Sequence, residues 1–137
     1  MRIIAGDLRG RRLHPPMGLP VRPTTDMARE ALFNILRNRV EFDQVSVLDL
    51  FSGTGAIGFE FVSRGVKHVT SVELNPKCVD FQKRTAEEFG LNNFVALRMD
   101  AFNFLGRSRQ AFDIVFADPP YELKQFDIIP ELVLKSF

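Results

Sequence analysis

The alternation of apolar and amphipathic segments limits this chain to a small group of folds. Four short apolar runs have the length and composition of buried strands, at residues 45–51, 69–72, 94–98 and 112–117. Helical patterns separate these runs. The first ends near Arg64, the second lies between an Asn75-Pro76 start and Gly90, and a short third covers 101–105. Strands that alternate with helices form a parallel sheet covered on both faces, so we predict an α/β fold.

A different pattern occupies the start of the chain. Residues 2–5 and 11–14 read as two short strands joined by a glycine-flanked turn, which predicts a β-hairpin. After a proline-rich connection, Thr24 or Thr25 is placed to cap a helix. We expect one apolar face on this helix, made of Ala28, Leu32, Ile35 and Leu36.

These patterns divide the chain into two regions, an N-terminal extension of residues 1–44 and a core of residues 45–137. The apolar spacing over 126–137 predicts an amphipathic helix, and the sequence stops inside it. A sheet that ended after four strands would leave an apolar edge exposed. We therefore expect this sequence to be truncated after its fourth core strand.

Composition narrows the classes of protein to which the chain can belong. At 137 residues it is one domain's worth of sequence, and 45% hydrophobic and 26% charged residues are ordinary for a soluble globular protein. No apolar run has the length of a membrane span, and the N-terminus lacks the apolar core of a signal peptide. A single cysteine, Cys78, excludes an internal disulfide and a cysteine-cluster zinc site. We expect a cytoplasmic protein.

Charge is distributed unevenly along the sequence. Residues 1–39 contain eight arginines, no lysine and three acidic residues, a net charge of +5, while the remainder carries ten basic and fourteen acidic residues. Guanidinium groups bind phosphate in a bidentate geometry, so this end of the chain favours contact with nucleic acid over general solubility. The alternative is a solvated basic surface. The candidate contacts are Arg9, Arg11, Arg12 and Arg22.

A glycine loop lies between the first predicted core strand and its helix. Gly53, Gly55 and Gly58 have the G-x-G-x-x-G spacing, which permits a tight turn and a close approach of the backbone to a ligand. Glu73 follows twenty residues after Gly53, at the end of the second strand. An acid at this place is suited to bind the hydroxyls of a ribose, so we predict a nucleoside-containing cofactor.

The acidic residues around the loop distinguish between two cofactors. A nicotinamide dinucleotide would place its pyrophosphate at the helix N-terminus, close to Asp49, and the charges would repel. S-adenosylmethionine has no phosphate and presents an ammonium and a sulfonium group instead. Asp100, after the third strand, is placed to accept from an adenine amine. The alternatives are a turn-capping carboxylate for Asp49 and a helix N-cap for Asp100.

The tetrapeptide Asp118-Pro119-Pro120-Tyr121 ends the last apolar run. Asp118 is able to accept a hydrogen bond from an exocyclic amine, and Tyr121 to stack on the base that carries it. Two prolines fix their φ angles and remove two backbone donors. The tetrapeptide predicts a nucleobase clamp, with a strand-terminating turn as the alternative.

Together the motifs resemble a known class of enzymes. The order Asp49-x-Phe51-x-Gly53-x-Gly55, Glu73, Asp100 and Asp118-Pro119-Pro120-Tyr121 resembles that of S-adenosylmethionine-dependent methyltransferases that modify exocyclic amines of nucleobases. The N-terminal segments Arg2-Ile3-Ile4-Ala5-Gly6 and Val21-Arg22-Pro23-Thr24-Thr25-Asp26-Met27-Ala28-Arg29-Glu30-Ala31-Leu32-Phe33 resemble the bacterial ribosomal RNA small subunit methyltransferase D family. Members of that family methylate N2 of a guanine in small-subunit rRNA.

This resemblance implies a Rossmann-like methyltransferase sheet of seven strands, of which four are present here with the hairpin. It implies a monomer that needs no metal and acts on ribosomal RNA within the small subunit or an assembly intermediate. The tetrapeptide would be catalytic. The cofactor residues would be Asp49, Phe51, Gly53, Gly55, Glu73, Asp100 and Ala101. Two other functions stay open: an adenine-N6 methyltransferase of DNA or RNA, and a non-catalytic nucleotide-binding module that serves as an RNA-binding assembly factor.

Overall fold

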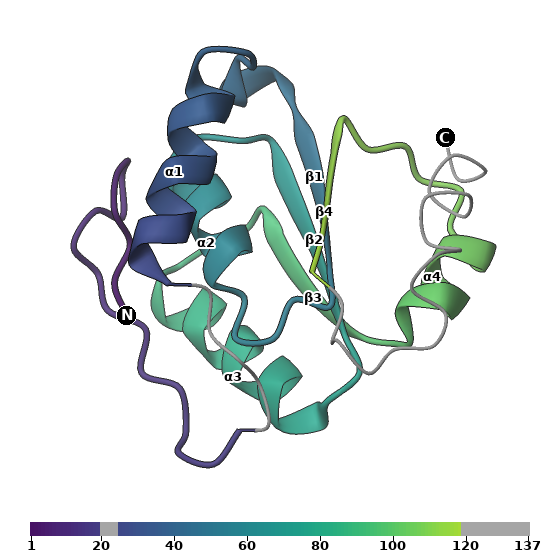
Figure 1. Cartoon of the computed structure of the whole chain (residues 1–137). Helices are drawn as coiled ribbons and strands as arrows, with labels where there is room; N and C mark the ends of the chain where they lie inside the picture. Colours follow the sequence, from purple (N-terminus) through teal and green to yellow (C-terminus); the bar gives the residue numbers. More distant parts are fainter. Residues whose placement is uncertain (20–24, 119–137) are drawn as a thin grey trace.

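Four parallel strands in the order β3-β2-β1-β4 form the sheet of this computed structural model, which describes residues 1–19 and 25–118 (Figure 1). The strands are β1 (Ser46–Leu50), β2 (His68–Glu73), β3 (Phe94–Arg98) and β4 (Ile114–Ala117). Leu50 pairs with Val72 on one side and with Ala117 on the other, so the carboxyl ends of β1, β2 and β4 meet at one edge of the sheet. The predicted α/β fold with a parallel sheet is confirmed.

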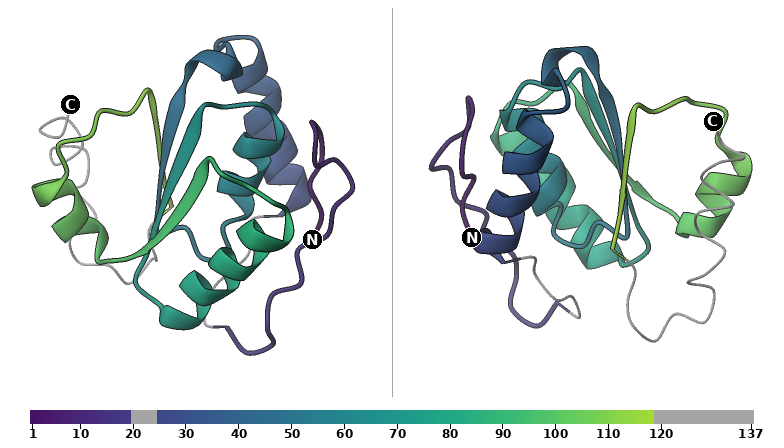
Figure 2. Two further views of the ribbon diagram at one scale, coloured as in Figure 1. Left: turned by 180° about the vertical axis from the view of Figure 1, so that it is seen from behind. Right: turned by 45° about the horizontal axis from the view of Figure 1, so that its top comes forward.

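Helices cover both faces of this sheet. They are α1 (Asp26–Arg37), α2 (Ala56–Ser63), α3 (Pro76–Glu88) and α4 (Ala101–Arg107). The first three lie on one face and α4 lies on the other (Figures 1 and 2). The chain steps from β1 through β2 to β3 in one direction and then returns across the sheet to β4, and right-handed crossovers place α4 on the opposite face. The direction reverses between β1 and β4, which is where open α/β sheets bind ligands.

Side-chain caps fix the helix starts close to the predicted positions. Oδ1 of Asn75 accepts from the backbone N–H groups of Lys77 (2.9 Å) and Cys78 (3.2 Å), and Pro76 occupies the first turn of α3. Of the two threonines considered for α1, Thr25 is the cap, with Oγ1 3.1 Å from the N–H of Ala28. Caps of this kind satisfy backbone donors that the first turn leaves unpaired.

The packed face of α1 agrees with the prediction only in part, since Leu32 and Leu36 are partly buried and pack against the core as expected. Ala28 is exposed and Ile35 is 57% exposed, so their assignment to the apolar face was wrong. Arg29 and Phe33 are fully buried in their place. Phe33 packs edge-on against Phe61 of α2 at 4.6 Å between ring centroids. Arg29 is buried because acidic groups pair with it, and apolar periodicity does not register such a partner.

The predicted N-terminal hairpin is present in reduced form. The structure assigns a single antiparallel bridge, Arg2 to Arg12, extended by a 2.9 Å hydrogen bond from the N–H of Ile3 to the carbonyl of Arg11. Ile3 and Leu13 are buried against α2 and α3, in a cluster with Phe59. This cover explains why every residue of the eight-residue helix α2 is buried. The N-terminal segment thus forms an outer layer over α2 (Figures 1 and 2).

Some predictions concern parts of the chain that are not described. The helix expected over 126–137 lies outside the described residues, as do Pro119, Pro120, Tyr121 and Arg22. The boundary between residues 44 and 45 coincides with the end of the short turn Phe42–Gln44 and stays a prediction. Within residues 1–19 and 25–118, no helix is long and apolar enough to span a bilayer.

Candidate functional site

The predicted site residues follow the carboxyl ends of the four strands. The glycine loop over 51–55 follows β1, Glu73 ends β2, Asp100 comes after β3 and Asp118 comes directly after β4. The structure therefore brings them to one edge of the sheet, around the reversal between β1 and β4. Glu73 and Asp118 both act electrostatically on Asp49, so each of them lies within interaction range of that buried carboxyl group.

The glycine loop contains three residues with positive φ. Gly53 (φ 59°) and Gly55 (φ 81°) adopt left-handed conformations that glycine reaches without strain. Phe51 has φ 55° without being glycine, a conformation that costs on the order of 1 kcal/mol. Its ring lies edge-on to Phe102 of α4, 6.1 Å between centroids. The tight turn predicted from the sequence is thus formed, and it is anchored to the opposite face of the sheet.

The third glycine of the spacing serves packing. A Cβ on Gly58 would lie 3.0 Å from the Phe94 ring and 3.1 Å from Val69 Cγ1. Both neighbours belong to the sheet, so Gly58 lets α2 approach it closely. The same helix turn then lies over Asp49, whose Oδ2 would be 3.6 Å from that Cβ.

Glu73 holds the loop in place. Its Oε1 accepts from the N–H of Gly53 at 2.8 Å, and its Oε2 accepts from the N–H of Asn75 at 2.9 Å. The side chain thereby ties the glycine loop to the start of α3. Each carboxylate oxygen has a second lone pair, so these bonds leave acceptor capacity for the ribose hydroxyls that the sequence predicts. That contact stays a prediction.

Asp49 is the most perturbed carboxyl group of the site. It is 1% exposed, and its Oδ2 has no hydrogen-bond partner among the described residues. Burial raises its pKa to about 8, and repulsion from Glu73 and then Asp118 adds to the rise, while a hydrogen bond from the backbone of Gly58 opposes it. At neutral pH the buried group is therefore mainly protonated, and a nearby cation would favour its ionised form.

This pKa makes the stability of the fold depend on pH. Unfolded Asp49 ionises near pH 3.8 and folded Asp49 near pH 8, so between these values the unfolded state binds fewer protons and stability falls as pH rises. We expect Asp49→Asn to remove this contribution, at most about 1.4 kcal/mol for each pH unit in that window. Urea unfolding of both proteins at pH 5 and pH 8 measures it. Parallel pH profiles would contradict the burial argument.

Asp100 and Asp118 differ in their surroundings. Asp100 is the N-cap of α4, with Oδ2 3.0 Å from the N–H of Asn103, which agrees with the alternative role considered for it. Its other oxygen stays a candidate for the adenine amine. Ala101 follows it and is buried. Asp118 is exposed at the end of β4, so its carboxylate is accessible to a ligand from solvent.

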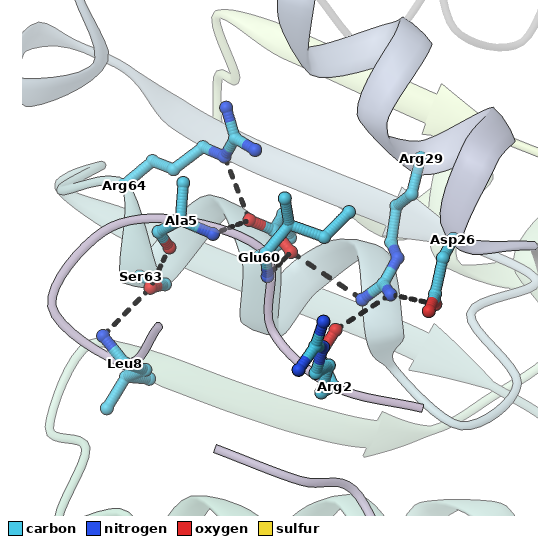
Figure 3. Close-up of polar contacts among 9 residues, drawn as sticks. Arg2, Ala5, Leu8, Asp26, Arg29, Glu60, Ser63 and Arg64 are labelled. Carbon is cyan, nitrogen blue, oxygen red and sulfur yellow. Dashed lines mark hydrogen bonds and ion pairs between the residues drawn. The ribbon is translucent and has the colours of Figure 1, made fainter. Parts of the chain in front are cut away.

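A buried ionic cluster joins the N-terminal segment to α2 (Figure 3). Glu60 of α2 is fully buried and accepts from the backbone N–H groups of Ile4 (2.9 Å) and Ala5 (3.2 Å). Arg64 Nε binds the same carboxylate at 2.9 Å, and Arg29 NH1 lies 3.5 Å from it. These pairs offset the desolvation of Glu60, which is costly for an isolated charge.

Arg29 extends this cluster to the start of the chain (Figure 3). Its NH2 group donates to the carbonyl of Arg2 at 2.9 Å and to Asp26 at 2.6 Å. Arg29 and Asp26 lie in the N-terminal motif quoted above, as does Arg2. Part of that motif therefore attaches the first residues to α1 and α2 rather than contacting a partner.

A second attachment lies one turn further along α2 (Figure 3). The hydroxyl of Ser63 accepts from the N–H of Leu8 at 2.9 Å, and its carbonyl accepts from the N–H of Asp7 at 2.8 Å. Gly6 passes so close that a Cβ there would lie 1.9 Å from the Ser63 carbonyl oxygen, and its φ is 89°. Only glycine fits this crossing.

Three of the predicted nucleic-acid contacts lie on this attached segment. Arg9, Arg11 and Arg12 are all exposed. The Arg11 guanidinium is stacked over the Phe89 ring, 4.4 Å from its centroid, so this residue also has a packing role. Arg9 and Arg12 are consequently the clearer candidates for phosphate contact.

Cys78 is the single cysteine of the sequence and lies near this edge of the sheet, at the start of α3. It is buried, and burial, with repulsion from Glu73, raises its pKa to about 11. The thiolate form is therefore scarce at neutral pH. Among residues 1–19 and 25–118, no three His, Cys, Asp or Glu side chains are grouped to hold a metal ion.

Comparisons with known proteins identify relatives over nearly the whole chain. The family described as Conserved hypothetical protein 95 matches residues 1–136. Ribosomal RNA small subunit methyltransferase D of Buchnera aphidicola subsp. Baizongia pistaciae is 33% identical over 136 residues, 99% of this chain and 69% of its own length. The protein of the same name from Escherichia coli K12 is 36% identical over 121 residues, 88% of this chain and 60% of its own.

A solved structure shows the same fold. That of yhhF from Escherichia coli superposes with a TM-score of 0.89 at 33% sequence identity, and the match covers 99% of this chain and 73% of the other. The chain thus spans between three fifths and three quarters of the length of these relatives.

Proposed function

Because the chain belongs to the family described as Conserved hypothetical protein 95, the ribosomal RNA small subunit methyltransferase D family, we propose that it methylates ribosomal RNA with S-adenosylmethionine. The acceptor in this proposal is the exocyclic N2 amine of a guanine in small-subunit (16S) rRNA. One observation carries the proposal. Asp118 and the glycine loop lie beside the same strand reversal, and Asp118 and Glu73 are each near enough to Asp49 to act on its charge.

The acidic edge fits a cationic cofactor. Glu73 and Asp118 both oppose ionisation of Asp49, so a ligand with positive charge would relieve the repulsion and a pyrophosphate would increase it. S-adenosylmethionine carries an ammonium and a sulfonium and no phosphate. The buried Asp49 Oδ2 that lacks a partner among the described residues is suited to a cationic neighbour. We assign cofactor binding to Asp49, Phe51, Gly53, Gly55, Glu73, Asp100 and Ala101.

The chemistry then rests on the tetrapeptide after β4. The cofactor, when bound, supplies an electrophilic methyl group. Asp118 accepts a hydrogen bond from the guanine amine, which orients the nitrogen lone pair and makes the nitrogen less conjugated with the ring. Positive charge develops on this nitrogen during transfer, and the carboxylate stabilises it. Pro119 and Pro120 leave nearby carbonyls free to accept, and Tyr121 stacks on the base.

The N-terminal segment provides the contact with RNA in this proposal. A base has to leave its stack to reach a site at the sheet edge. The RNA backbone on either side of that base then has to be bound by other residues of the protein. Exposed Arg9, Arg11 and Arg12 supply positive charge on a segment that is attached to α2, and Arg22 is assigned with them. We further propose that the protein acts in the cytoplasm as a monomer, on the small subunit or an assembly intermediate.

The decisive experiment incubates the full-length protein and labelled S-adenosylmethionine with unmodified small ribosomal subunits and maps the methylated base. We expect label on N2 of a guanine. Label on an adenine would replace this proposal with an adenine-N6 activity. RNA binding without any label would replace it with a non-catalytic assembly factor.

Substituting Arg9 and Arg12 tests the RNA contact. In the double variant Arg9→Gln/Arg12→Gln we expect weaker RNA binding and a salt dependence, as log K against log salt, that is shallower by about 1.4 if each residue neutralises one phosphate of single-stranded RNA. Fluorescence anisotropy at several salt concentrations measures the slope.

The matched control is Lys67→Gln/Arg109→Gln, which removes the same charge from two exposed residues that precede β2 and β4. These lie away from the carboxyl edge, so we expect the slope to stay near its wild-type value. Equal slopes in the two double variants would show that only net charge matters.

A further inference from the structure

Gln82 of α3 is a buried polar residue that contacts the glycine loop. It is fully buried, and its amide nitrogen donates to the hydroxyl of Ser52 at 2.9 Å and to the carbonyl of Gly53 at 2.7 Å. Its amide oxygen accepts from the hydroxyl of Ser71 at 2.6 Å. Both N–H groups are thus used, and Ser71 on β2 fixes which way the amide faces.

The backbone N–H and carbonyl groups of Gly53 are hydrogen-bonded to side chains from two different elements, β2 and α3. Its N–H donates to Glu73 Oε1 at 2.8 Å, and its carbonyl accepts from Gln82 Nε2 at 2.7 Å. Ser52 is fixed as well, since its N–H donates to the carbonyl of Val72 at 3.1 Å. Gly53 has φ 59°, and glycine is conformationally free, so both hydrogen bonds restrict its backbone to this conformation.

The aliphatic part of Gln82 shapes the loop sterically. A Cβ on Gly55 would lie 3.0 Å from both Cγ and Cδ of Gln82, so the loop rests directly on this side chain. An apolar residue of the same size would fill this space equally well. It would leave the Gly53 carbonyl and the Ser52 hydroxyl without their donor. A buried acceptor without a donor costs the free energy of its desolvation.

We propose that Gln82 is a positioning residue for the cofactor: it holds residues 52–55 in the conformation that receives S-adenosylmethionine, without touching the cofactor itself. Preorganisation of this kind strengthens binding because the loop does not have to be ordered when the ligand arrives. The proposal rests on the proposed function, since it takes the loop to be the cofactor site.

The test compares Gln82→Met with Thr85→Val in the full chain. Methionine keeps the shape of glutamine without its hydrogen bonds, and Thr85 is a buried polar residue one turn along the same helix, away from the loop contacts above. We expect Gln82→Met to weaken S-adenosylmethionine binding by about tenfold in calorimetry and to raise the KM for cofactor, with the KM for RNA unchanged. Thr85→Val is expected to leave both constants near wild type.

A second variant and a second readout keep the test decisive. Ser52→Ala removes one of the two acceptors and is expected to weaken cofactor binding by about threefold, less than additively with Gln82→Met. In the absence of cofactor, amide exchange at Gly53 and Gly55 should be faster in Gln82→Met than in wild type. Unchanged exchange and affinity, or equal losses in Thr85→Val, would overturn the proposal. If wild type itself fails to bind S-adenosylmethionine, the proposed function and the cofactor role fall, and the exchange rates still show whether Gln82 holds the loop.

Discussion

Asp118→Ala is expected to lower the rate constant for methyl transfer by about 10³-fold, while the Kd for S-adenosylmethionine changes less than about threefold. The asymmetry follows from position. Asp118 is exposed at the end of β4, whereas the residues assigned to the cofactor lie on and beside the glycine loop after β1. Its loss removes one negative charge from the acidic edge, but no direct cofactor contact is assigned to it, so cofactor binding should weaken only slightly. Single-turnover assays and calorimetry separate the two quantities.

Asp113→Ala is the matched control, because Asp113 is an exposed carboxylate that precedes the same strand. It accepts from the N–H of Ser46 at 2.8 Å, at the opposite edge of the sheet, so its loss should affect stability slightly and methyl transfer little. Asp118→Asn keeps an acceptor without the charge and is expected to retain part of the rate. Equal losses of cofactor binding and transfer in Asp118→Ala would rule out the positioning role.

Gly6→Ala is expected to detach the N-terminal segment from α2 and to destabilise the fold by about 3–5 kcal/mol. The new Cβ would lie 1.9 Å from the carbonyl oxygen of Ser63, which is backbone and has no room to yield. Displacing the crossing breaks the bonds that Ile4 and Ala5 make to Glu60 and leaves that carboxylate with fewer partners. Chemical denaturation measures the loss, and RNA affinity should fall with it.

Gly10→Ala separates strain from steric conflict. Gly10 is in the same hairpin with nearly the same φ, 83° against 89°, but a Cβ there meets no atom within 4 Å. We therefore expect it to cost only about 1 kcal/mol, the usual penalty for a non-glycine residue in this conformation. If the two variants are equally stable, the contact between Gly6 and Ser63 does not hold the segment.

The elements of the sheet could be predicted because their signals are local. The strand Phe94–Arg98 has the predicted bounds, and Asn75-Pro76 starts α3 where the sequence places it. Such signals depend on a few neighbouring residues, so they can be recognised in a single sequence without knowledge of distant contacts. The last strand was predicted from residue 112 and begins at Ile114, the first of its residues that pairs with β1 in the sheet.

The buried polar residues could not be predicted, because their partners are distant in the sequence. Glu60 binds the backbone of Ile4 across 56 positions, and Gln82 reaches Gly53 across 29. Apolar periodicity treats each of them as a surface residue. The same reasoning correctly placed Leu32 and Leu36 on the packed face of α1 but missed Arg29, which is buried there. A glutamate inside an otherwise apolar helix such as α2 was the one available sign that something covers it.

Because the first residues are attached to α2, a chimera between this protein and a relative should take the N-terminal segment and α2 from the same parent. A chimera joined between residues 44 and 45 would pair one protein's N-terminal segment with another's Glu60 and Ser63, whose side chains have to match it. Because α2 also continues the glycine loop, a graft that exchanges the N-terminal segment together with α2 exchanges this loop as well. A graft that ends after Ser63 keeps both sets of contacts within one parent.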